Sequence, residues 1–137
     1  MILCLDIGSK RIGVARLISG VILPLDPIIR SENRLKIADK ITELVKNLEI
    51  KILVIGKEFD NIAASKTSDF FADLLKNTFN KNNLSIEICF ADESFSSAQS
   101  ESKLLHQKYK TRQKSRKNGT LDSLAACEIL ERYIKKL

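Results

Sequence analysis

The chain has 137 residues, of which 44% are hydrophobic and 29% are charged, a size and balance typical of one compact domain. It contains no low-complexity tract and no long uncharged apolar run, which excludes a disordered chain and a membrane span. The apolar N-terminus lacks a basic leader and meets an acid at Asp6, a pattern that does not fit a signal peptide. We therefore expect one domain over residues 1–137 that works in the cytoplasm without a membrane partner.

Three cysteines and one histidine are spread widely along the sequence. Cys4, Cys89 and Cys127 each lie in an apolar stretch, and His106 has no cysteine near it. A zinc site would need closely spaced Cys or Cys/His pairs. The spacing instead predicts small buried hydrophobic residues.

The excess of positive charge is concentrated in one segment. Lys and Arg total 23 against 17 Asp and Glu, a formal net charge of +6. Residues 103–117, named here the basic strip, contain no acid, and Tyr109 within them can stack on a base. The strip's charged residues are Lys103, Lys108, Lys110, Arg112, Lys114, Arg116 and Lys117. Two interpretations stay open: a contact with a nucleic-acid backbone, or a solvated connector that keeps the protein in solution.

The first thirty residues predict three short strands, over 2–7, 12–18 and 21–29, with breaks at Gly8 and Gly20. Such short spacings suit antiparallel hairpins. Pro24 and Pro27 either place the third strand at a sheet edge or shorten it, because proline cannot donate a ladder hydrogen bond.

Helical and strand patterns then alternate. Apolar residues at helical spacing predict a helix over 33–48 behind a Ser31 or Asn33 cap, and residues 52–56 read as a strand buried on both faces. A second helix is expected to begin at Ser65 or Ser68 and to continue to Phe79.

A fifth strand is predicted over residues 84–90, followed by a third helix from Ser96 to about Gln107. A last helix is expected behind a Thr120 cap. This order predicts an α/β fold, with a mixed five-stranded sheet flanked by helices.

Three acids occupy comparable positions at the ends of these elements. Asp6 lies near the end of the first strand, Glu93 follows the fifth, and Asp122 lies in the first turn of the last helix. Strand ends in α/β sheets are where sites form, and oxygen ligands suit Mg²⁺ or Mn²⁺, which support phosphodiester hydrolysis. Each acid could instead have a purely structural role. This alternative is strongest for Asp122, since an acid stabilises a helix N-terminus without any part in catalysis. It is weakest for Asp6, which would be buried after four apolar residues.

Glycines flank a tight turn between the first two strands, and Lys10 and Arg11 lie at its tip, where they can hold a phosphate backbone. The turn fits neither a dinucleotide fingerprint nor a P-loop, because both glycine spacings are absent and no helix follows. An actin-like or sugar-kinase phosphate loop fails on length, since those folds need two such domains.

The whole chain resembles the YqgF/RuvX family, described as Holliday junction resolvases and as nucleases that mature the 5′ end of pre-16S ribosomal RNA. The opening motif at 5–15 (LDIGSKRIGVA) is the most specific element, and 53–56 (LVIG), 92–97 (DESFSS) and 122–126 (DSLAA) are similar to later family motifs. The resemblance implies an RNase H-like fold, with Asp6, Glu93 and Asp122 as catalytic, metal-binding carboxylates.

Two positions depart from the family pattern. Ser94 stands where an arginine usually follows the acidic pair, and residues 56–59 (GKEF) replace a Gly-Leu-Pro segment. A missing guanidinium weakens phosphate positioning, so we expect modest activity. Glu58 lies where related nucleases often carry an acid and is a reserve candidate ligand.

We therefore expect a nuclease that depends on Mg²⁺ or Mn²⁺ and acts on structured nucleic acid, with 5′-end processing of pre-16S rRNA as the leading function. The alternatives are a Holliday junction resolvase in DNA recombination, or a non-catalytic nucleic-acid-binding factor in ribosome assembly. The expected partner is pre-rRNA or branched DNA, and the expected state is a monomer or weak homodimer. The residues expected to bind nucleic acid are Lys10, Arg11, Lys108, Lys110, Arg112, Lys114, Arg116 and Lys117.

Overall fold

The computed structural model describes residues 1–30, 33–93 and 119–136, and within 119–122 it describes the backbone alone. The sheet is mixed and five-stranded, as expected from the sequence, and its strand order is β3-β2-β1-β4-β5. The described elements are β1 (Ile2–Ile7), β2 (Arg11–Ile18), β3 (Val21–Ile29), α1 (Arg34–Asn47), β4 (Ile52–Lys57), α2 (Ile62–Lys81), β5 (Glu87–Asp92) and α4 (Gly119–Lys135).

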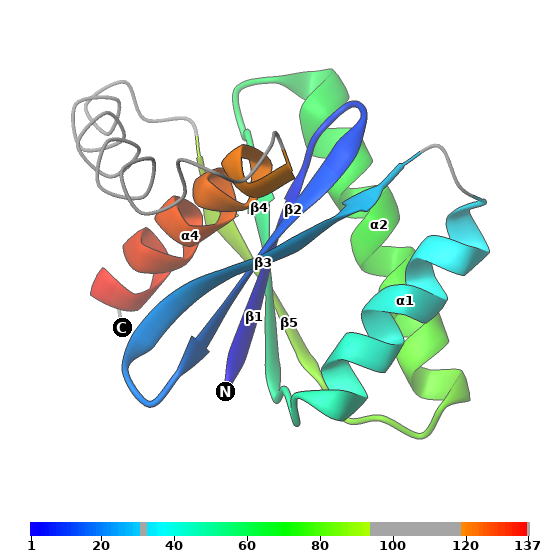
Figure 1. Ribbon diagram of the computed structural model, residues 1–137. Helices are drawn as coiled ribbons and strands as arrows, with labels where there is room; N and C mark the ends of the chain where they lie inside the picture. The colour runs from blue at the N-terminus through cyan, green and yellow to red at the C-terminus, as the bar shows by residue number, and fades with distance from the viewer. Residues whose placement is uncertain (31–32, 94–118, 137) are drawn as a thin grey trace.

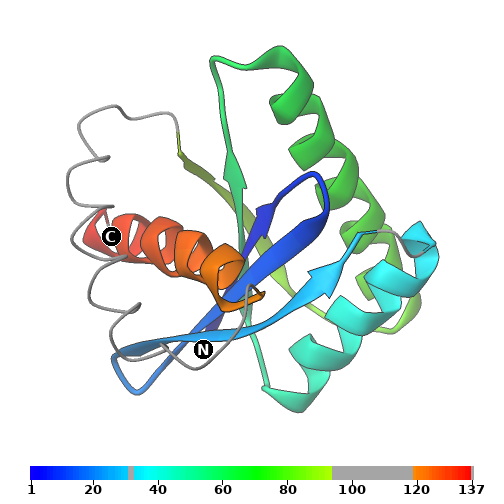
Figure 2. The ribbon, with the colours of Figure 1, turned by 45° about the horizontal axis from the view of Figure 1, so that its top comes forward.

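The sheet lies between two layers of helix (Figures 1 and 2): α1 and α2 cover one face and α4 covers the other. Because successive side chains of a strand point to opposite faces, β1 contributes to both cores. Leu3 and Leu5 join the core beneath α1 and α2, whereas Cys4 joins the core beneath α4. Asp6 follows the same alternation and therefore belongs to the face that α4 covers.

The strand directions bring the carboxyl ends of three strands together at the same end of the sheet. β1 runs parallel to β4, and β4 runs parallel to β5. β1 and β2, and β2 and β3, pair antiparallel. The carboxyl ends of β1, β4 and β5 therefore lie side by side. β3 is an edge strand, which confirms one of the two outcomes expected from Pro24 and Pro27.

The helix caps differ in part from the sequence expectation. Asn33 caps α1 by accepting a hydrogen bond from the Leu35 amide at 2.8 Å, which confirms one of the two expected caps. The prediction for α2 was wrong: the helix begins at Ile62 behind Asn61, whose side chain accepts from the Ala64 amide. Ser68 lies in the interior of the helix sequence, and its hydroxyl donates a hydrogen bond to the Gly56 carbonyl in β4 instead of capping the helix.

The remaining elements agree with the prediction except at their boundaries. β5 begins at Glu87 rather than at residue 84. The last helix begins at Gly119, one residue before the expected Thr120 cap. The helix expected over 96–107 lies outside the described residues. Among the described helices, none has the length and apolar character needed to cross a membrane.

Candidate active site

Asp6 lies in the central strand of the sheet, one residue before β1 ends. Its register partner in β2 is Gly13, which has no side chain to cover it. On the other side of β1 is β4, which also carries a glycine, Gly56, near its end. Both strands beside β1 therefore carry a glycine close to Asp6.

Glu93 follows directly after β5 and is held by the neighbouring strand. Its backbone amide donates to the Lys57 carbonyl at 3.1 Å. A Cβ placed on Gly56 would lie 3.3 Å from the Glu93 carboxyl carbon and from Oε1. The carboxyl group thus lies over Gly56, where any larger residue would crowd it.

Asp6 and Glu93 meet at this end of the sheet, as the sequence predicted for these two residues. Burial, the negative charge of Asp6 and a hydrogen bond with Asp6 together raise the pKa of Glu93 from 4.5 to about 8. An ionised carboxylate can only accept, so a hydrogen bond between these two acids requires one of them to carry a proton. The two acids therefore share a proton at neutral pH.

Glu58, just past the end of β4, adds to the same electrostatic cluster. Its charge raises the pKa of Glu93 further. The reserve candidate from the sequence is therefore near enough to act on the acid pair. The carboxyl ends of the three strands β1, β4 and β5 thus each place one acid at this end of the sheet.

Asp122, the third expected ligand, lies in the first turn of α4. Its side chain is outside the described part of the structure. The backbone of α4 packs against β1, β2 and β3, and its next residue, Ser123, is buried. The helix start is therefore on the same face of the sheet as Asp6.

Among the side chains that the structure describes, no group of three His, Cys, Asp or Glu residues is arranged to hold a metal ion. The donor chemistry nevertheless fits a hard divalent cation, because the acids present only oxygen and repel one another when ionised. Asp6 and Glu93 would hold such a cation, and Glu58 is close enough for its charge to act on Glu93.

Arg132 in α4 is a residue of this region that the sequence analysis missed. Its charge lowers the pKa of Glu93, opposing the effect of the acids. Nη2 donates to Glu128 Oε1 at 2.9 Å, while buried Nε and Nη1 have no hydrogen-bond partner within the described chain. The only sequence signal was the Glu–Arg spacing of four residues, which is common on exposed helix faces.

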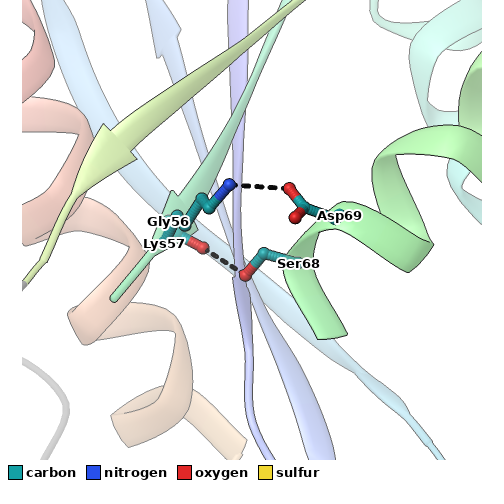
Figure 3. A network of polar contacts seen from close by, with 4 residues as sticks. All are labelled: Gly56, Lys57, Ser68 and Asp69. Atoms are coloured by element: carbon teal, nitrogen blue, oxygen red, sulfur yellow. Dashed lines mark hydrogen bonds and ion pairs between the residues drawn. The ribbon is translucent and has the colours of Figure 1, made fainter. Parts of the chain in front are cut away.

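The end of β4 is fixed from the opposite face by α2 (Figure 3). The Ser68 hydroxyl donates to the Gly56 carbonyl at 2.9 Å, and Lys57 Nζ lies 2.7 Å from Asp69 Oδ1. The hydrogen bond from Ser68 is buried, and it fixes the position of Gly56, over which the Glu93 carboxyl group lies.

The turn between β1 and β2 is closed by hydrogen bonds that require glycine. The Gly8 amide donates to the Arg11 carbonyl at 2.9 Å, and a Cβ on Gly8 would lie only 2.6 Å from that oxygen. Arg30 Nη1 donates to the Gly8 carbonyl at 2.6 Å. Lys10 and Arg11 are exposed at this turn, close to the end of β1.

The other expected nucleic-acid contacts belong to the basic strip, residues 103–117, which lies outside the described residues. Ser94, where the family arginine is absent, also lies outside them. These predictions therefore stay predictions.

Comparison with known protein families finds one model over nearly the whole chain. The model described as "RuvX: Holliday junction resolvase" matches residues 1–136. A relative from Helicobacter pylori strain 26695 is 38% identical over 138 residues, covering 100% of this chain and 97% of the relative. A relative from Helicobacter hepaticus is 39% identical, covering 98% of this chain and 94% of the relative. Both carry the name "Putative pre-16S rRNA nuclease".

Among solved structures, RuvC of Thermus thermophilus in complex with a Holliday junction substrate superimposes with a TM-score of 0.63. The sequences are 9% identical, and the match covers 98% of this chain and 94% of RuvC. A second RuvC structure from the same organism gives a TM-score of 0.62. At this identity the likeness concerns the fold, which confirms the expected RNase H-like architecture.

Proposed function

This chain belongs to the RuvX family, and from that premise we propose that it is a divalent-metal-dependent nuclease that processes the 5′ end of pre-16S rRNA. The observation that carries the proposal is the pairing of Asp6 with Glu93 at the shared end of β1 and β5. A partly buried carboxyl group whose pKa is raised by a second acid, as that of Glu93 is by Asp6, is expected where a cation or a proton must be held. The names of the curated relatives support an RNA substrate.

Asp6, Glu93 and Asp122 are the proposed metal ligands, and Glu58 is a further candidate. A bound Mg²⁺ or Mn²⁺ would lower the pKa of the attacking water and stabilise the leaving oxygen of the phosphodiester. Asp6 lies in β1, the central strand of the sheet, which has a hydrogen-bonded strand on each side. Glu93 is positioned by its backbone bond to Lys57 and by contact with Gly56, so its carboxyl group is preorganised.

Substrate binding is assigned to positive groups around this end of the sheet. Lys10 and Arg11, exposed in the β1–β2 turn, would contact the phosphate backbone beside Asp6. The basic strip would extend that contact along the nucleic acid. We further propose that residues 1–137 act as one domain, as a monomer or weak homodimer, in the cytoplasm.

Cleavage of branched DNA is the second candidate function, because the matching family model is described as a Holliday junction resolvase. Resolution of a symmetric junction would require two active sites, and hence a dimer. The RNA function places no such demand on a single chain.

A cleavage assay on both substrates tests these assignments. Pre-16S rRNA fragments and four-way DNA junctions are incubated with the protein in Mg²⁺, Mn²⁺ or EDTA. We expect metal-dependent cleavage of the RNA at its 5′ end, and a decrease of orders of magnitude for Asp6→Asn, which keeps the side-chain size but removes the charge. Preferential junction cleavage would favour the second candidate. Tight binding without cleavage in any metal would refute catalysis and leave the assembly-factor function.

A further inference from the structure

The hydroxyl group of Ser123 lies within the hydrogen-bond ladder of the sheet, although Ser123 belongs to helix α4. The residue is fully buried, with 0% of its surface exposed. Its Oγ accepts a hydrogen bond from the Val14 amide at 3.2 Å and donates one to the Leu25 carbonyl at 2.5 Å. Val14 and Leu25 are register partners in β2 and β3, so the hydroxyl bridges two adjacent strands.

An irregularity in the sheet makes room for this bridge. Between the pairs Ile12–Ile28 and Val14–Leu25 the register shifts, so that residues 26–27 of β3 lie opposite Gly13 alone. Such a bulge leaves ladder groups without their usual strand partners. Buried backbone groups need a hydrogen bond, and Ser123 supplies one to each strand.

The bridge lies next to Asp6 along the sheet. Gly13, at the bulge, is the register partner of Asp6 in β1, and Val14 is the next residue. The apolar contacts of α4, such as those of Cys127 and Leu130 with the core, hold the helix against the sheet through non-directional interactions. The two hydrogen bonds at the first turn are directional and fix its position.

We propose that Ser123 is a positioning residue that holds the first turn of α4, and with it Asp122, beside Asp6. The inference rests on the proposed function, in which Asp122 is a metal ligand. Ser123 itself does not touch the metal or the substrate. Its role is to fix the position of the first turn of α4 relative to β2 and β3, and with it the backbone of the neighbouring residue, Asp122.

Mn²⁺ binding to the full chain, measured by isothermal titration calorimetry, tests this role without relying on cleavage. Ser123→Ala removes both bonds, and we expect Mn²⁺ affinity to fall about 10- to 100-fold, as for residues that orient metal ligands. Ser123→Thr keeps the hydroxyl and should retain most of the affinity. Thr42→Ala is the matched control, because it removes another buried hydroxyl, bonded to the Ala38 carbonyl at 2.7 Å, from α1 on the opposite face.

A double-mutant cycle separates positioning from general stability. In an Asp122→Asn background, Ser123→Ala should cause no further loss of Mn²⁺ affinity, since the ligand that it positions is already gone. Additive losses, unchanged affinity in Ser123→Ala, or an equal loss in Thr42→Ala would each overturn the inference. If Ser123→Ala does not fold, Ser123→Thr and Ser123→Cys are compared in the same cycle, and equal affinity for both would overturn it. A wild-type chain that binds no Mn²⁺ would refute the proposed function itself, and the inference with it.

Discussion

Replacing Glu93 with glutamine should change how the stability of the metal-free protein depends on pH. Because burial and Asp6 raise the pKa of Glu93 to about 8, the folded protein holds a proton that the unfolded chain releases near 4.5. The stabilisation from that proton is complete below pH 4.5 and is lost as the pH rises through about 8. Glu93→Gln is neutral throughout, and its amide can still donate to Asp6.

The size of the effect follows from the shift in pKa. At about 1.4 kcal/mol per pKa unit, the full shift would correspond to about 5 kcal/mol, an upper limit for a fully buried group. Glu93 is only half-buried, so water screens part of the interaction. We therefore expect the free energy of unfolding of the wild-type protein to fall by about 2 kcal/mol between pH 5 and pH 9.

Urea unfolding in EDTA, followed by far-UV circular dichroism at several pH values, measures this dependence. The variant should lose less stability than the wild type over this range and should be the more stable protein at pH 9. Glu43→Gln, at an exposed position in α1, controls for removal of a negative charge far from the site. If the free energy of unfolding of the wild type does not fall over this pH range, or if that of the variant falls by the same amount, the two acids do not share a proton.

Three other predictions concern the carboxyl end of the sheet and its surroundings. Gly56→Ala should weaken Mn²⁺ binding and lower the thermal midpoint, because its Cβ would lie 2.7 Å from Ile129 Cδ1 and press on Glu93; unchanged calorimetry would contradict this packing. Removing four charges of the basic strip should weaken binding to all sequences alike and flatten the salt dependence by about 0.7–0.9 per lost phosphate contact, measured by fluorescence anisotropy at several salt concentrations. Ser94→Arg should raise the cleavage rate by restoring a guanidinium beside the acids, and a rate equal to the wild type would show that its absence limits nothing.

The fold could be predicted well because its signals are local. Alternating and helical apolar spacings identified each strand of the sheet and each helix that the structure describes, and two prolines marked the edge strand. The cap of α2 was predicted wrongly because serine and asparagine are equally good caps. The tertiary bond from Ser68 to Gly56, which shows that Ser68 is interior, has no sequence signature.

The candidate site was predictable only in part. Asp6 and Glu93 stand out because an acid at a strand end is unexpected in an otherwise apolar stretch, and the structure brings these two together. Ser123 could not be found in this way, because its partners lie 109 and 98 residues away and depend on a bulge. Arg132 was missed because a Glu–Arg pair at helical spacing looks the same whether it is exposed or, as here, mostly buried.

The acid pair is difficult to explain by folding alone. Two carboxyl groups that meet at the carboxyl end of the sheet stabilise nothing that neutral side chains would not stabilise better, and their ionised forms repel. Arg132 opposes this repulsion only in part, since the pKa of Glu93 remains near 8 in its presence. A divalent cation would displace the shared proton and remove the repulsion, so its binding should become tighter as the pH rises toward 8. The same interaction that lowers the stability of the metal-free protein above neutral pH would then be the source of its affinity for metal. Saturating Mg²⁺ should accordingly remove most of the pH-dependent loss of stability in the wild type and have little effect on Glu93→Gln.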